Sequence, residues 1–287
     1  MNSLGKIRIG SRGSNLAIAQ AKIVEDLLIK KGFQTEIIKI KSKGDYFDIP
    51  LRFSNGFGIF TKELDKALLN NEIDMAVHSM KDYPTTIEKG LKISAVLKRG
   101  PVEDFLVSKF SFFSLPEGAK IGTSSQRRRD FIKFLRPDLE VVDLRGNLDT
   151  RIRKYNNGEY DGIVVAKVGL ERLGINIVGE TLDKDIFVPQ PNQGAIAVIT
   201  RDDEFFKIAS SIDDIISHME TMVEREALKV VNAGCHSSLG IISVYQNDHM
   251  RFHASFIKNG KRMDFYRLFS LDKLDLLLND FKRWYNE

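Results

Sequence analysis

Cysteine is almost absent from this sequence of 287 residues, and no long apolar run interrupts it. The one cysteine, Cys235, excludes an internal disulfide. No stretch approaches the roughly 20 apolar residues that span a bilayer, so we expect no membrane partner. Residues 1–10 carry no apolar run after their charges, which is unlike a signal peptide. Together these absences predict a cytoplasmic protein.

A large excess of one charge is also lacking. The chain has 43 basic and 39 acidic residues, a formal net charge of +4, so we expect no nucleic-acid partner. The five histidines are scattered, with His249 and His253 in a strand-like run, and we predict no metal site. Neither a Walker A pattern nor a GxGxxG turn is present, which makes a nucleotide the weaker interpretation.

Two stretches of the sequence share one order of predicted elements. Residues 7–40 give a strand, a helix that begins after Ser14 and ends at Gly32, and a second strand. Residues 119–144 repeat this order, and residues 70–79 resemble residues 156–166. We therefore predict an α/β fold of two similar lobes, with chance similarity of two α/β units as the alternative. Clefts between such lobes are preferred ligand sites.

The predicted domain boundaries follow from these patterns. Lobe 1 comprises residues 1–95 and 192–212, with a mobile loop at 43–60. Lobe 2 comprises residues 99–189, and the segment after it returns the chain to lobe 1. Residues 214–287 form a small C-terminal α+β domain with an amphipathic helix near its end.

Three consecutive arginines follow a hydroxyl-rich turn in the stretch "IGTSSQRRRDF". If Ser124 or Ser125 caps the next helix, Arg127 and Arg128 lie in its first turn. Cations are unfavourable there by about 0.3–1 kcal/mol, so we expect an anion among them. Arginine favours bidentate binding of carboxylate or phosphate. The alternative is a set of surface salt bridges or a solvated face.

Other candidate residues lie at predicted strand ends or on a small-residue loop. Asp82 follows a buried strand in "AVHSMKDYP", where it could offset a developing positive charge or move protons. Its alternative role is a structural salt bridge with Lys81 or an arginine, and His78 is expected to be a packed strand residue. Cys235 lies on a Gly/Ser loop and is either a nucleophile or an inert buried thiol. The remaining anion-binding candidates are Arg12, Ser14, Arg145, Arg151 and Arg172.

The sequence resembles the porphobilinogen deaminase family in stretches that run in family order from residue 7 to about residue 240. These include "IGSRGSNLAIAQA", "DMAVHSMKDYP", "GTSSQRRR", "RPDLEVVDLRGNLDTRIRK" and "NQGAIAV". The resemblance implies two similar periplasmic-binding-protein-like (type II) lobes around a cleft, plus a small α+β C-terminal domain. It implies a monomeric transferase of tetrapyrrole and heme biosynthesis, a hydroxymethylbilane synthase. Such an enzyme joins four molecules of its small-molecule substrate, porphobilinogen, with loss of ammonia, and releases hydroxymethylbilane by hydrolysis.

The resemblance also assigns residues. It implies a dipyrromethane cofactor held by a covalent thioether to Cys235, and it makes Asp82 the catalytic carboxylate. The implied cofactor-binding residues, besides Cys235, are Ser79, Lys81, Thr123, Ser125, Arg127 and Arg128. The implied substrate-binding residues are Arg12, Ser14, Gln20, Arg145, Arg151 and Arg172. Arg129 has no family role and is expected to face solvent.

The sequence departs from the family pattern in three places. Phe57 stands where the family usually has a lysine, in a loop expected to be a mobile lid. The cysteine loop reads Cys235-His236-Ser237, and His236 is a candidate for tuning the thiol. Lys167 is unusual after the second-lobe strand. The alternative function is a non-catalytic cytosolic anion-binding protein of the two-lobed solute-binding type, to which Asp82 and Cys235 are the counterevidence.

Overall fold

The computed structural model describes residues 5–41, 61–233 and 238–287. They divide into two compact units, one formed by Met1–Arg99 with Ala195–His218 and the other by Gly100–Gly194 with Met219–Glu287. The predicted three-part division of the chain stays a prediction, as does the cleft between the lobes. No helix among the described residues has the length and apolar character needed to cross a membrane.

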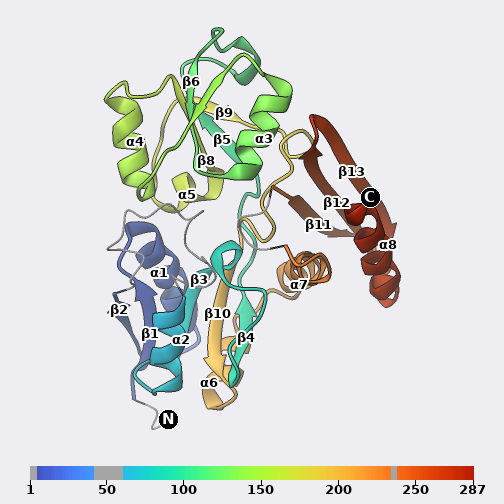
Figure 1. Cartoon of the computed structure of the whole chain (residues 1–287). Helices are drawn as coiled ribbons and strands as arrows, with labels where there is room; N and C mark the ends of the chain where they lie inside the picture. The colour runs from blue at the N-terminus through green and yellow to red at the C-terminus, as the bar shows by residue number, and fades with distance from the viewer. Residues whose placement is uncertain (1–4, 42–60, 234–237) are drawn as a thin grey trace. The chain divides into compact units, whose positions relative to one another are not determined.

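The first unit is built on a five-stranded sheet in the order β2-β1-β3-β10-β4. Strands β2, β1 and β3 are parallel, whereas β10 runs antiparallel to both of its neighbours. The strands are β1 (Ile7–Arg12), β2 (Thr35–Ile40), β3 (Met75–Ser79), β4 (Leu91–Val96) and β10 (Ile196–Arg201). The helices of this unit are α1 (Asn15–Lys30), α2 (Lys62–Leu69) and α6 (Glu204–Ser210), drawn beside the sheet in Figure 1.

Helix α1 forms where the sequence predicts it. The Ser14 hydroxyl accepts a hydrogen bond from the backbone N–H of Ala17, which satisfies one of the unpaired donors of the first turn. Ala21, Val24 and Leu28 then recur on one face and are fully buried against the sheet. Gly32, just past the helix, has a φ of 88°, a conformation that favours glycine. These local features hold the carboxyl end of β1 and the start of α1 in place.

The second unit contains a sheet with the same topology, in the order β7-β6-β8-β5-β9. Here β7, β6 and β8 are parallel and β5 is antiparallel to both neighbours. The strands are β5 (Asp104–Val107), β6 (Lys120–Gly122), β7 (Glu140–Val142), β8 (Gly162–Ala166) and β9 (Gly179–Thr181). The antiparallel strand of the first sheet, β10, comes after the parallel strands of the second sheet in the sequence. The antiparallel strand of the second sheet, β5, likewise comes after the parallel strands of the first sheet. The prediction of two similar α/β lobes with the periplasmic-binding-protein-like type II topology is confirmed.

Helices cover both faces of this second sheet (Figure 1). Val164 of β8 belongs to the cluster under α3 (Gln126–Leu135), while its neighbours Ile163 and Val165 pack on the other face. That other face is covered by α4 (Leu148–Asn156) and α5 (Lys167–Arg172). Alternate residues of one strand therefore point to opposite helical layers, as strand geometry requires.

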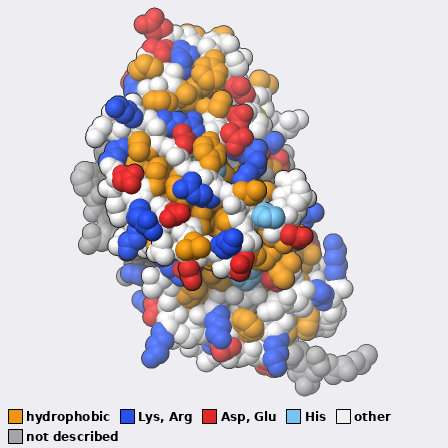
Figure 2. All heavy atoms as spheres, turned by 90° about the vertical axis from the view of Figure 1, so that its right-hand side faces the viewer, with side chains coloured by type: hydrophobic (Ala, Val, Ile, Leu, Met, Phe, Trp, Pro, Cys, Tyr) orange, Lys and Arg blue, Asp and Glu red, His pale blue; other side chains and the backbone are white. Residues whose placement is uncertain are grey.

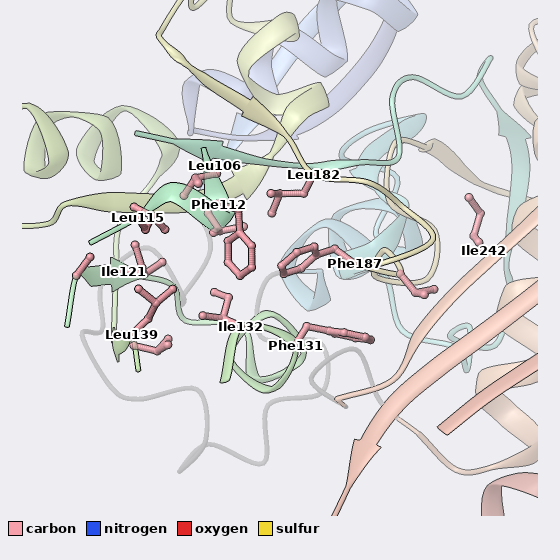
Figure 3. Close-up of a cluster of buried hydrophobic side chains, with 14 residues drawn as sticks. Leu106, Phe112, Leu115, Ile121, Phe131, Ile132, Leu139, Leu182, Phe187 and Ile242 are labelled. Carbon is pink, nitrogen blue, oxygen red and sulfur yellow. The ribbon is translucent and has the colours of Figure 1, made fainter. Parts of the chain in front are cut away.

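The core beneath α3 fixes the helix that carries the arginine run. Phe131 is fully buried with Phe112 and Phe187, and Figure 3 shows the three rings gathered in one cluster. Ile242 of β11 belongs to the same cluster, so within this unit the C-terminal sheet packs beside α3. Truncating a buried phenylalanine typically costs about 3–5 kcal/mol, so α3 is held firmly by its apolar side.

The C-terminal residues form the small α+β arrangement that the pattern predicts. Its antiparallel sheet has the order β11-β12-β13, with strands β11 (Gly240–Gln246), β12 (His249–Lys258) and β13 (Lys261–Phe269). Helices α7 (Ile215–Val230) and α8 (Leu274–Asn286) pack on it. Phe252, Phe265 and Phe281 meet edge to face in the core between them.

Candidate active site

In the first unit, the candidate residues follow the carboxyl ends of two neighbouring parallel strands. Ser79 ends β3, and its hydroxyl accepts a hydrogen bond of 2.7 Å from Gln20 Nε2 and donates one of 3.1 Å to Gln20 Oε1. Gln20 is only 2% exposed on α1. This reciprocal pair joins α1 to the end of β3, immediately before the segment that carries Asp82. Ligands of open α/β sheets bind at this edge.

Lys81 and Asp82 lie in a 3-10 turn, η3 (Met80–Asp82), which continues directly from β3. Asp82 is exposed and Lys81 is half-buried. The Met80 N–H donates to the carbonyl of Ala195, so the turn is tied to the residue before β10. The structure therefore presents the predicted catalytic carboxylate to solvent from a turn with a fixed start.

Arg12 ends β1, next to β3. Burial and, to a lesser extent, the nearby charge of Arg12 together lower the pKa of His78 to about 3. His78 is 5% exposed, which agrees with its predicted role as a packed strand residue. The structure thus brings the first-unit candidates to one edge of the sheet: Arg12, Ser14, Gln20, Ser79, Lys81 and Asp82.

In the second unit, the hydroxyl-rich turn after β6 forms the N-terminus of α3. Ser125 is the N-cap, and its hydroxyl accepts a hydrogen bond from the Arg128 N–H. Thr123 is fully buried, and its hydroxyl accepts a hydrogen bond of 3.2 Å from the Ser125 N–H. The Ser124 hydroxyl donates to the carbonyl of Leu144. Arg127 and Arg128 therefore lie in the first turn, as predicted from the cap.

Both of these arginines are buried and share one carboxylate. Arg127 donates to one oxygen of Asp104 and Arg128 to the other, each at 2.7 Å. Gln193 Nε2 adds a hydrogen bond of 2.9 Å to Asp104. Burial opposes ionisation of Asp104, but the two guanidinium charges and these hydrogen bonds outweigh it and hold its pKa well below the usual range.

The remaining nitrogens of the two guanidinium groups differ in their pairing. The second terminal nitrogens of Arg127 and Arg128 donate to the carbonyls of Val188 and Val164. The Nε atoms of both arginines are buried and have no hydrogen-bond partner among the described residues. Two cations face a single carboxylate, so the cluster carries a surplus positive charge at the positive end of a helix. A bound carboxylate would satisfy both deficits, so these residues fit a polycarboxylate cofactor such as dipyrromethane.

The other candidate arginines of the second unit lie near the sheet edge at which α3 begins. Arg145 follows β7 and is half-buried. Arg151, on α4, donates from Nε to the carbonyl of Gly146 at 2.8 Å. Arg172 ends α5 and donates to the carbonyl of Gly194 at 2.6 Å, and burial lowers its pKa to about 10. These backbone contacts hold Arg151 and Arg172 in place.

Arg129 differs from its two neighbours. It is partly exposed, donates to the carbonyl of Val141 and forms an ion pair of 2.8 Å with Asp143. Lys167 is half-buried at the start of α5. On the molecular face shown in Figure 2, basic and acidic side chains are interspersed.

Some candidate residues lie outside the described residues, and some contributing residues were not predicted. Cys235, His236 and Phe57 belong to the first group. Asp104 and Gln193 belong to the second. In the sequence, Asp104 follows Glu103 and directly precedes the apolar run "FLV", and an acid that adjoins a predicted buried strand is the pattern that could have indicated it. No group of three or more potential metal ligands is found within the described ranges.

Comparison with known proteins shows the family of the chain. The family model "Porphobilinogen deaminase, dipyromethane cofactor binding domain" matches residues 7–207. The chain belongs to the porphobilinogen deaminase family. It is an enzyme of the transferase class, and the matched domain is the one that binds the family's dipyrromethane cofactor.

The relatives of this porphobilinogen deaminase family member cover nearly the whole chain. "Probable porphobilinogen deaminase" of Metallosphaera sedula is 43% identical over 90% of this chain and 89% of its own length. Proteins of the same name from Picrophilus torridus and Methanosarcina acetivorans are 44% and 47% identical, over 90% and 85% of this chain and 92% and 79% of their own. Among solved structures, the methionine binding protein MetQ matches 80% of this chain and 96% of its own at 13% identity, with a TM-score of 0.42, a likeness too distant to indicate a ligand.

Proposed function

We propose that this chain is a hydroxymethylbilane synthase. It adds four porphobilinogen molecules stepwise to a dipyrromethane cofactor linked through a thioether to Cys235, with loss of one ammonia at each addition. Hydrolysis then releases the linear tetrapyrrole hydroxymethylbilane. The observation that carries this proposal is the cluster of Asp104, Arg127 and Arg128, with its surplus charge and two unpartnered Nε donors.

The arginine cluster is the proposed cofactor site. The pyrroles of the cofactor carry acetate and propionate groups, and when bound the cofactor supplies the pyrrole carbon to which the substrate is joined. The Nε donors of Arg127 and Arg128 hold carboxylates, and Thr123 and Ser125 lie at the same positive helix end. Asp104 keeps both guanidinium groups oriented, so that no reorganisation is needed when the anion binds.

The turn that carries Lys81 and Asp82 is the proposed chemical centre. An exposed carboxylate on a fixed turn can accept hydrogen bonds from pyrrole N–H groups and offset the positive charge that develops as ammonia leaves. Lys81 and Ser79 hold cofactor carboxylates beside it. The proposed substrate-binding residues are Arg12, Ser14, Gln20, Arg145, Arg151 and Arg172. We propose that the enzyme acts as a cytoplasmic monomer, with porphobilinogen as its partner and with neither nucleic acid nor membrane.

Intact-protein mass spectrometry tests the proposal. Chain purified from a tetrapyrrole-making host should carry an adduct of about two pyrrole units, and Cys235→Ser should lack it. The wild-type chain should also consume porphobilinogen and release hydroxymethylbilane. An unmodified mass together with no consumption of porphobilinogen would favour the anion-binding alternative instead.

A further inference from the structure

The turn that carries Asp82 is followed by a tyrosine whose side chain is held at both ends. Tyr83 is 1% exposed, and its ring lies 5.0 Å from the ring of His78, centroid to centroid. Its hydroxyl donates to Asp65 Oδ1 at 3.4 Å. Its backbone N–H donates to the carbonyl of Met80 and closes the 3-10 turn. Tyr83 therefore joins the end of β3, the turn and helix α2.

Ordinary core packing does not account for this arrangement. A phenylalanine would fill the space beside His78 without a polar group that needs a partner. Instead, the chain buries a carboxylate, Asp65, which is 8% exposed. Burying a carboxylate is unfavourable unless it is well paired, and among the described residues the hydrogen bond of 3.4 Å from Tyr83 is modest compensation. Residues that break the local rules of packing in this way are concentrated at functional sites.

The neighbours of the pair indicate what it does. Lys81 and Asp82 lie between His78 and Tyr83 in the sequence; Asp82 is exposed and Lys81 half-buried, whereas His78 and Tyr83 are buried. The start of the turn is fixed by the hydrogen bond from Met80 to Ala195. The end of the turn is fixed through Tyr83, whose hydroxyl reaches α2. A shift of about 1 Å in a reacting group can lower a rate by orders of magnitude, so both anchors bear on Asp82.

We propose that Asp65 and Tyr83 are positioning residues that hold the turn carrying Lys81 and Asp82 in its working geometry. The proposal rests on the proposed function, in which Asp82 is the catalytic carboxylate. Neither residue touches the reacting atoms. Tyr83 transmits the position of α2 to the turn, and Asp65 sets the orientation of the tyrosine.

The test uses the full-length chain with its cofactor assembled and porphobilinogen as substrate. Tyr83→Phe keeps the ring on His78 and removes only the hydroxyl. We expect kcat to fall by about 3- to 10-fold, the effect of one hydrogen bond, while KM stays within about twofold. Asp65→Leu, which has no acceptor for the tyrosine hydroxyl, should have a similar effect. The double variant should be no slower than either single variant, because both changes remove the same interaction.

Tyr245→Phe is the matched control. The Tyr245 hydroxyl donates to Asp248 at 3.3 Å, nearly the distance of the Tyr83–Asp65 hydrogen bond. Tyr245 lies on β11 of the C-terminal sheet, far in sequence from the turn after β3. Its kcat should equal that of the wild type. Should Tyr83→Phe fail to fold, Asp65→Leu carries the test alone, since leucine has a branched side chain similar to that of aspartate but offers no acceptor.

The outcomes separate this proposal from the one on which it rests. An active wild-type enzyme whose kcat is unchanged in both single variants would overturn the positioning role alone. So would a double variant whose loss is the product of the two single losses. A wild-type chain that carries no adduct and consumes no porphobilinogen would overturn the proposed function and the positioning role with it.

Discussion

Asp104 accepts a hydrogen bond of 2.7 Å from Arg127, and neither side chain is more than 2% exposed. The same carboxylate receives Arg128 on its other oxygen. One buried acid thus orients two arginines at the start of α3, about 23 residues further along the chain. A buried ion pair of this kind adds little stability compared with an apolar core, but removing one partner leaves uncompensated charge.

Asp104→Asn should therefore be strongly destabilising. It leaves two buried guanidinium groups without a carboxylate, and we expect a loss of about 3–5 kcal/mol in the free energy of unfolding, measured by denaturant titration. The folded pKa of Asp104 lies below its unfolded value of about 4, so its contribution is present above that pH and is lost only as the pH falls further. The destabilisation should therefore be constant between pH 5 and pH 8.

Asp143→Asn is the control for this prediction, because Asp143 pairs with Arg129 on the same helix at 2.8 Å but is exposed. Exposed pairs contribute about 0–1 kcal/mol, so this variant should be close to the wild type. Equal losses from the two variants would contradict the special status of Asp104.

Arg128→Ala should impair assembly of the cofactor. The change removes a buried guanidinium whose Nε has no partner among the described residues. We expect a purified chain with little or no dipyrromethane adduct by intact mass, whereas Arg129→Ala should carry the full adduct. Arg128→Lys separates charge from geometry, since lysine lacks the guanidinium fork. Full adduct in both Arg128 variants would show that this helix end does not hold the cofactor.

Asp82→Asn should leave the adduct in place and abolish most of the turnover. Asp82 is exposed, so its replacement by an isosteric amide should change the free energy of unfolding by about 0.5 kcal/mol or less. Loss of a group that moves protons or stabilises charge typically lowers a rate by about 100-fold or more. Steady-state consumption of porphobilinogen by the loaded variant gives the measurement. Normal turnover would remove Asp82 from the mechanism.

The sequence was sufficient for those parts of the fold that depend on nearby residues. Ser14 and Ser125 cap their helices as predicted, because a cap needs only a hydroxyl and the backbone amide of a residue a few positions later. The alternating strands and helices follow from hydrophobic periodicity, and the repeated order of elements became two sheets of identical topology. The placement of Arg127 and Arg128 in the first turn of α3 followed from the cap.

The sequence was not sufficient where a side chain meets a partner from a distant segment. Asp104 lies 89 residues before Gln193, and no periodic pattern links them. Asp65 and Tyr83 meet only because α2 packs beside the end of β3, and a helical pattern does not say which neighbour an acidic residue will face. Such contacts are set by the tertiary packing, which overrides local preference. The assigned roles of Cys235 and the other site residues stay predictions.

The last prediction concerns the stability of the Asp65 variant. The pKa of Asp65 is raised to about 6, chiefly by burial, which outweighs the lowering effect of the hydrogen bond from Tyr83, with a further raising effect of the Glu88 charge. The folded chain therefore binds this proton more tightly than the unfolded chain, whose aspartates titrate at about pH 4. Stability must then fall as the pH rises from about 4 through 6, and the loss persists at higher pH.

Asp65→Asn removes the titrating group, so it should be more stable than the wild type at pH 8 by about 1–3 kcal/mol. The difference should shrink as the pH is lowered and vanish near pH 4, as measured by denaturant titrations at several pH values. Asp26→Asn, an exposed position on α1, should show no such trend. Such a gain in stability, together with the loss of kcat expected of Asp65→Leu, would mark Asp65 as a residue kept for function at a cost to stability. A variant that loses stability at pH 8 would instead make Asp65 an ordinary structural residue.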